Sequence, residues 1–80
     1  MELKYWAVLN NVENSIDNPF AIIRKTHTET NILNEYRTSS RLWLEDNDFV
    51  YRNLMVIGGS EDVERITEEQ AMKVLKKWDE

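Results

Sequence analysis

The sequence contains no cysteine, and this absence excludes both a disulfide framework and a thiolate metal site. It has one histidine, His27, so a zinc site would need three carboxylate ligands, which is an unusual set. The two glycines, Gly58 and Gly59, are followed by an acidic run that would repel a phosphate group rather than cradle it. We therefore expect neither a metal nor a cofactor.

Long apolar runs are also absent. No segment approaches the roughly 20 residues that a transmembrane helix needs, and residues 1–6 lack the basic and apolar regions of a signal peptide. We expect a cytoplasmic chain without membrane association. The 80 residues suit one domain, 1–80, with a thin core, and 41% apolar residues are enough for that domain to fold.

The formal net charge of −5 is unevenly distributed along the chain. Residues 1–43 carry five basic and five acidic side chains, whereas residues 44–80 carry five basic and ten acidic ones. An acidic chain is repelled by phosphate backbones unless a local basic patch outweighs the total charge. The charge balance therefore disfavours nucleic acid as a partner.

The clearest element is an amphipathic helix over residues 67–78. Thr67 is a good N-cap, and Gln70 completes a capping box with it. Four apolar residues recur at helical spacing and form one stripe: Ala71, Val74, Leu75 and Trp78. A single helix of this length is marginal in water, so it needs an apolar surface, most simply a small β-sheet.

Three earlier segments predict strands. Residues 3–9 have largely apolar side chains on both faces, residues 20–25 form a second strand, and residues 31–36 resume the pattern after a polar turn. The segment 41–44 fits either a fourth strand or an anchor under the helix, and 63–66 fits a brief extension against the sheet. We therefore predict an α+β fold, with a three- to four-stranded, mostly antiparallel sheet and the helix 67–78 packed on one face.

A second, short helix is predicted over residues 47–56. Asp46, Asn47 and Asp48 form a capping cluster, and Val50 and Leu54 recur at helical spacing. Alternation from residue 49 to residue 55 also fits a strand. The glycine pair at 58–59 is expected to end the helix.

The opening Tyr5-Trp6-Ala7-Val8-Leu9-Asn10, the tryptophan at position 43 and the ending Ile66-Thr67-Glu68-Glu69-Gln70-Ala71 resemble small uncharacterised proteins of bacteria and their phages. The resemblance spans most of the chain and rests on packing and capping residues. It implies an origin in a phage or another mobile element. No activity is implied by it, so it assigns no functional residue.

No arrangement of residues indicates catalysis, and we expect no enzymatic activity. His27 could act as a base oriented by Glu29 or Glu35 across the hairpin, but a polar histidine at a turn is the simpler interpretation. We therefore interpret the chain as a non-catalytic protein-interaction or regulatory module.

The alternative function is binding of nucleic acid by a basic hairpin. Its candidate basic patch consists of Arg24, Lys25, His27, Arg37 and Arg41. With Tyr36 and Trp43 nearby, this is the composition of a platform for single-stranded nucleic acid. Acidic residues interrupt the patch, and a solvated sheet edge explains it equally well.

The candidate interface consists of Trp6, Val8 and Ile23, on the sheet face opposite the helix 67–78. A contiguous apolar face without cover usually marks an interface. We therefore predict a two-fold homodimer or a docked protein partner, with Trp6 at the buried centre. The competing account is that the helix 47–56 and Trp43 cover this face and complete a monomeric core.

Overall fold

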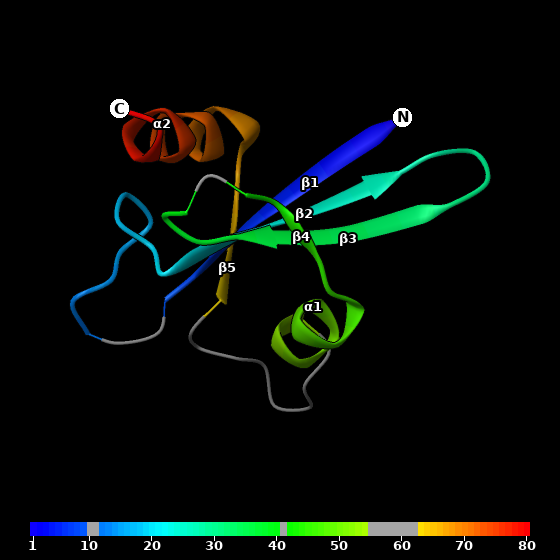
Figure 1. The fold of residues 1–80 in the computed structure, drawn as a ribbon, viewed down its shortest axis with the longest axis horizontal. Coiled ribbons are helices and arrows are strands. Elements are labelled where there is room, and N and C mark those ends of the chain that lie inside the picture. Colours follow the sequence, from blue (N-terminus) through cyan, green and yellow to red (C-terminus); the bar gives the residue numbers. More distant parts are fainter. Residues whose placement is uncertain (10–11, 41, 55–62) are drawn as a thin grey trace.

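The computed structural model of the protein describes residues 1–9, 12–40, 42–54 and 63–80. These residues form an antiparallel sheet with a helix on each face, which confirms the predicted α+β class (Figure 1). The elements in chain order are β1 (Glu2–Val8), β2 (Ala21–His27), β3 (Ile32–Arg37), β4 (Leu44–Glu45), α1 (Asn47–Leu54), β5 (Val63–Ile66) and α2 (Glu68–Trp78).

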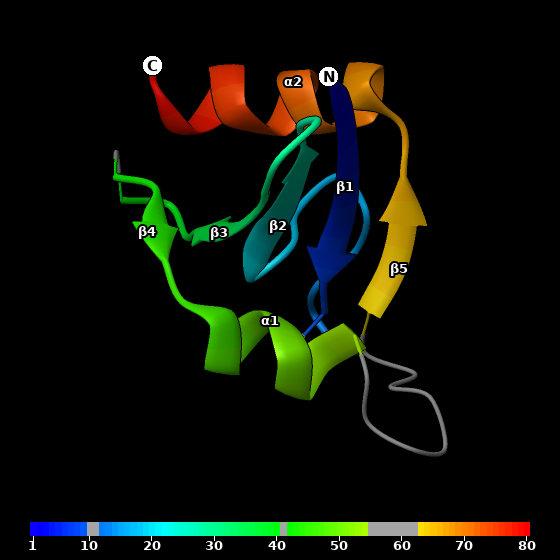
Figure 2. The same ribbon diagram turned by 90° about the vertical axis from the view of Figure 1, so that its right-hand side faces the viewer.

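The sheet has the strand order β4-β3-β2-β1-β5, and every neighbouring pair is antiparallel (Figure 2). Within the described residues it therefore has five strands, where the sequence predicted three or four. The two additional strands are short: β4 has two residues and β5 has four. Such short segments show little alternation, and β5 becomes a strand because it pairs with the distant β1.

Helix α2 begins as the sequence predicts. The Thr67 side chain accepts from the Gln70 backbone N–H at 3.1 Å, and the Gln70 side chain accepts from the Thr67 N–H at 2.8 Å. This capping box satisfies two of the donors that a helix start leaves unpaired. The helix buries its apolar stripe against one face of the sheet, here called the α2 side, and the core there contains Tyr5, Ala7, Ile22, Ile66, Ala71 and Val74.

Helix α1 covers the opposite face, here called the α1 side (Figure 2). Its N-cap is Asp46, whose carboxylate accepts from the Phe49 backbone N–H at 2.9 Å. Val50 is buried against Val8, Ala21 and Ile23, so the helical interpretation of this segment is confirmed. The glycine pair expected to end the helix lies outside the described residues.

The expectation that no second helix is long enough to cover this face fully is wrong for Val8 and Ile23, which are buried beneath α1, while Trp6 stays half-buried. Helix α1 is short, but Val50 and the partly buried Phe49 reach the sheet, and Phe49 stacks on Tyr36 with ring centroids 4.0 Å apart. Trp43 packs on the α2 side instead of joining this cover.

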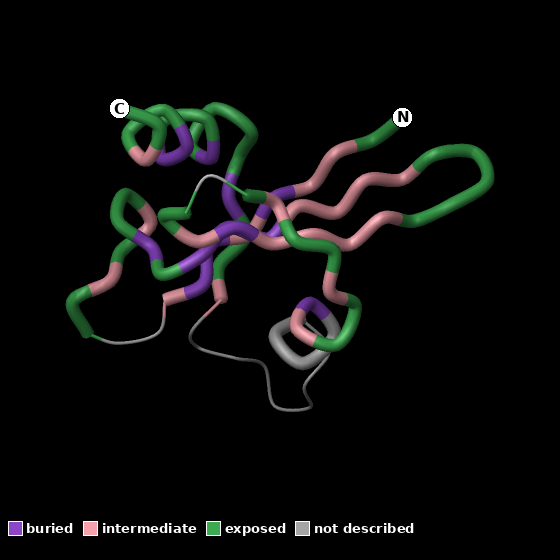
Figure 3. Tube along the Cα trace, in the orientation of Figure 1, coloured by how far each residue is buried: buried purple, intermediate pink, exposed green. Residues whose placement is uncertain are grey.

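Both helices leave one end of the sheet bare. The N-terminal part of β1 and the β2–β3 hairpin extend beyond them, and their residues are half-buried or exposed (Figures 1 and 3). No helix in the described ranges combines the length and apolar character needed to cross a membrane.

Candidate interaction surface

A polar cluster crosses the α2 side of the sheet beside the apolar core. Tyr5, Arg24 and Glu35 are direct neighbours on β1, β2 and β3. Arg24 donates from Nε and Nη2 to Glu35 Oε1 at 3.1 and 2.9 Å, and its guanidinium lies 3.9 Å from the centre of a Trp43 ring. Both charged side chains are largely buried, so this ion pair helps to hold β2, β3 and the segment before β4 together.

Tyr5 completes this cluster at its buried end. Burial of the phenol raises the pKa of Tyr5 above its usual value, the nearby Arg24 guanidinium opposes that rise, and the Glu68 carboxylate adds to it. Tyr5 is therefore neutral over the physiological range. The cluster has the properties of a structural network, because each polar member already has a partner within the chain.

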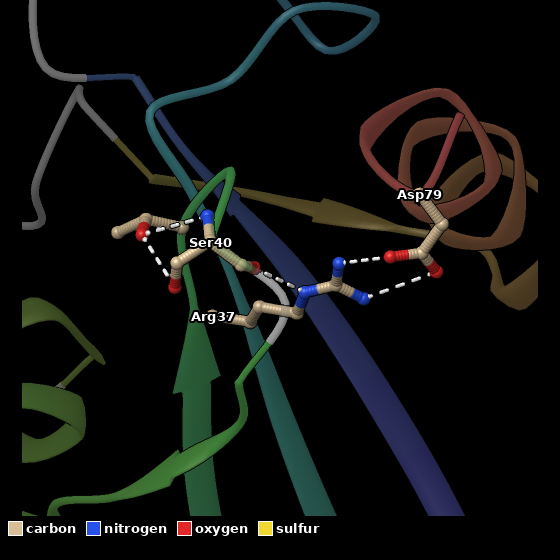
Figure 4. Close-up of polar contacts among 4 residues, drawn as sticks. Arg37, Ser40 and Asp79 are labelled. Carbon is tan, nitrogen blue, oxygen red and sulfur yellow. Dashed lines mark hydrogen bonds and ion pairs between the residues drawn. The ribbon is translucent and has the colours of Figure 1, made fainter.

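Arg37 is a buried cation that joins distant parts of the chain (Figure 4). Its Nε donates to the Ser40 carbonyl oxygen at 2.7 Å, and Nη1 and Nη2 donate to the two carboxylate oxygens of Asp79. Its guanidinium also lies 5.9 Å from the Trp78 ring centre. Arg37 thus fastens the segment after β3 to the C-terminal end of α2, where a positive charge is favourable.

The predicted basic patch is not assembled as the sequence suggested. Arg24 and Arg37 lie on the α2 side and are engaged by Glu35 and Asp79, whereas Lys25 and His27, one and three residues along β2 from Arg24, lie on the α1 side. Successive strand residues point to opposite faces, and this alternation separates cations that are adjacent in sequence. The fifth member, Arg41, lies outside the described residues.

The constellation considered for catalysis is also divided between the two faces. His27 is on the α1 side, while Glu35 is on the α2 side and bonded to Arg24. Glu29 is exposed in the turn between β2 and β3. Among the described residues, no three His, Asp or Glu side chains lie close enough together to hold a metal ion.

The candidate interface residues lie mostly inside the chain's own core. Val8 and Ile23 are buried beneath α1, so their side chains are not available to a partner of the folded chain. Trp6 is half-buried, and the guanidinium of Arg65 lies 5.0 Å from its ring centre. An interface at Trp6 stays a prediction, but it would have to include Arg65.

The outer side of β3, beyond the short β4, is covered by the chain's own hydrogen bonds. The carbonyl oxygen of Asn34 accepts from the Asp46 N–H at 3.3 Å, and the N–H of Ile32 donates to the Asn31 side chain at 2.9 Å. Strand β4 continues this cover by pairing with Glu35 and Tyr36. A further strand would therefore find few unpaired backbone groups here.

The edge of the sheet at β5 has no partner strand among the described residues. In an antiparallel strand the backbone N–H and C=O of successive residues point to alternate sides. The carbonyl of Asn34 points away from β2, toward Asp46, and the residue pairing from β3 through β2 and β1 then gives the direction of each backbone group on β5. The backbone N–H and C=O groups of Glu64 and Ile66 therefore point toward β1, and those of Val63 and Arg65 point away from the sheet. No hydrogen bond joins these outward groups to any residue that the structure describes.

Sequence reasoning did not find this edge, because the order of strands in a sheet is not visible in a local pattern. The only available signal was the run Val63-Glu64-Arg65-Ile66 ahead of the helix cap.

Comparison of the chain with protein-family models, with curated proteins and with solved structures gives no match. The candidate interaction surface therefore rests on the geometry of β5 alone.

Proposed function

We propose that the chain is a non-catalytic module that binds a protein partner, and that the partner engages the open β5 edge of the sheet. The contrast between the outer side of β3 and the edge at β5 supports this proposal. On the outer side of β3 the backbone groups are bonded by Asn31 and Asp46, whereas no described residue hydrogen-bonds the outward backbone groups of Val63 and Arg65. An unpaired edge is a template for an incoming strand, and strand addition is a common mode of peptide recognition.

Two further observations favour binding over catalysis. The Arg24–Glu35 and Arg37–Asp79 pairs tie structural elements together, so these charges already have a role in the fold. Val50 and Phe49 of α1, and the buried stripe of α2, pack on the sheet and support it behind β5. A rigid platform lowers the entropic cost of ordering a flexible partner segment.

Affinity capture from extracts of the source organism, with an edge-blocked variant, tests this function. Proline at position 65 removes an outward N–H and no ladder bond, so Arg65→Pro should fold and lose the partner. Arg65→Ala is the matched control, because it removes the charge and the Trp6 contact but keeps the N–H. We expect the partner on the wild type, a reduced amount of it on Arg65→Ala, and its loss on Arg65→Pro.

Circular dichroism of each variant checks that the fold is retained. Turnover in a broad screen of hydrolase and transferase substrates would contradict the non-catalytic assignment. Retention of the partner by folded Arg65→Pro would leave the binding function in place but remove β5 as its site.

A further inference from the structure

We infer that the strand accepted at β5 comes from a different protein and carries an acidic residue followed directly by a basic one. This inference rests on the proposed function and adds the chemistry of the partner. It follows from two charged side chains of β5. Glu64 lies on the α2 side, in one row with Ala7, and Arg65 lies on the α1 side, beside Trp6.

The charges of β5 define the side chains that a neighbouring strand must present. Directly opposite residues of antiparallel strands share a face, and opposite charges there are favourable while like charges are destabilising. An added antiparallel strand therefore needs an acidic residue opposite Arg65 and, next along its chain, a basic residue opposite Glu64. Strand β5 has only four residues and carries two charges, and both features disfavour pairing with a strand whose charges do not match. Strand β5 therefore selects a partner strand by its charges.

A second copy of this chain does not satisfy that requirement. Two copies that extend one sheet are related by a two-fold axis perpendicular to it, which keeps the α1 and α2 sides continuous. Registers of this kind centred on Glu64 or Arg65 place Glu64 opposite Glu64 of the other copy, or Arg65 opposite Arg65 of the other copy, and a register centred on Ile66 places Glu64 opposite Glu68 of the other copy. Each centre thus opposes like charges.

A register that instead placed Glu64 opposite Arg65 of the second copy is excluded by shape. Glu64 and Arg65 are on opposite faces, so the second copy would have to be turned over. Both sheets would then extend to the same side of the shared edge and occupy the same space. A short strand with no sheet behind it meets no such obstacle, which favours an extended segment of another protein.

The surroundings of β5 strengthen the preference for a basic residue on the α2 side. Glu68 and Glu69 are exposed in the first turn of α2, directly after β5 and its cap. Together with Glu64 they make this end of the edge negative. On the α1 side the cation of Arg65 lies over the Trp6 ring, which fixes the place where an acidic side chain would be received.

Synthetic peptides test the inference directly. The matched probe is Ser-Thr-Val-Glu-Lys-Val-Thr-Ser, and the control probe Ser-Thr-Val-Lys-Glu-Val-Thr-Ser has the same composition with the two charges exchanged. Binding is followed by ¹⁵N NMR titration into the millimolar range, together with amide hydrogen exchange. We expect the Val63 and Arg65 amides to exchange quickly in the free chain and to become protected when the matched probe binds.

The charge-swapped probe should bind about tenfold more weakly, since two favourable pairs become two unfavourable ones. The double variant Glu64→Arg with Arg65→Glu should reverse this preference. Arg65→Pro, with a native circular dichroism spectrum, should bind neither probe.

Three results would overturn the inference: no protection of Val63 and Arg65 by the matched probe, equal affinity for both probes, or a concentration-dependent dimer that Arg65→Pro abolishes. The first two leave the proposed binding function standing if capture of a partner succeeds, because they concern only the site and its charge selectivity. Failure of capture with the wild-type chain would instead count against the proposed function itself.

Discussion

Removing the carboxylate of Asp79 should destabilise the chain more than removing the charge of Arg37. The Arg37 side chain is 5% exposed, whereas that of Asp79 is 50% exposed. Without Asp79, a buried guanidinium keeps only the Ser40 carbonyl as its described acceptor. Without Arg37, the carboxylate can turn to water. Removing Asp79 and removing Arg37 should therefore lower the free energy of unfolding by unequal amounts.

The magnitude follows from this asymmetry. Removing one partner of a fully buried pair costs about 3–5 kcal/mol, and the half-exposed position of Asp79 lets water replace part of the lost interaction. We expect Asp79→Ala to lower the free energy of unfolding by about 2 kcal/mol, or the melting temperature by about 10 °C in a domain of this size. Arg37→Met keeps most of the buried stem volume, and it should cost about 1 kcal/mol or less.

Urea denaturation followed by circular dichroism measures both values, and the double variant completes a cycle. The cycle matters because Asp79 is the C-cap of α2, where the helix dipole disfavours a carboxylate, so Asp79→Ala includes a small gain unrelated to Arg37. We expect a coupling energy of about 1–2 kcal/mol that changes little with added salt. A greater cost for Arg37→Met than for Asp79→Ala would refute the reasoning.

Three further outcomes are expected. Burial raises the pKa of Tyr5, so the folded chain keeps the phenolic proton to a higher pH than the unfolded chain does. The free energy of unfolding should therefore fall as pH rises above about 10, and Tyr5→Phe should reduce that fall in urea titrations at alkaline pH. Thr67→Ala removes the cap of α2 and should cost about 1 kcal/mol in thermal unfolding, and a neutral result would show that the capping box does not hold in solution. Val50→Ala should cost about 2 kcal/mol in chemical denaturation, because Val50 seals the α1 side; a change below about 0.5 kcal/mol would mean that α1 does not close this face.

Several features of the fold were predictable because their causes are local. The capping box of Thr67 and Gln70, the stripe along α2 and the cap at Asp46 depend on residues within a few positions of one another. Strands β1, β2 and β3 were also visible, since each is long enough for its side chains to show a pattern. Their antiparallel order follows from short connections, which favour pairing of consecutive strands.

The candidate site depends on features that have no local cause. Five basic residues in one stretch suggested a patch, but alternation along β2 separates Arg24 from Lys25, and carboxylates engage Arg24 and Arg37. The partner of Arg37 is Asp79, at the far end of the chain. No spacing rule connects these two residues, because the contact exists only after α2 has packed across the sheet.

The sequence by itself determined the α+β class, both helix starts and the three central strands, because hydrophobic period and capping chemistry act over one or two turns of chain. Tertiary structure decided which face each helix covers and which backbone edge has no partner in the part of the chain that the structure describes. Those outcomes depend on pairing β5 with β1 and on placing Val50 over Val8 and Ile23, and such contacts form between segments far apart in the chain. The open edge at Val63 and Arg65 is therefore a property of the folded sheet, and no stretch of sequence contains it.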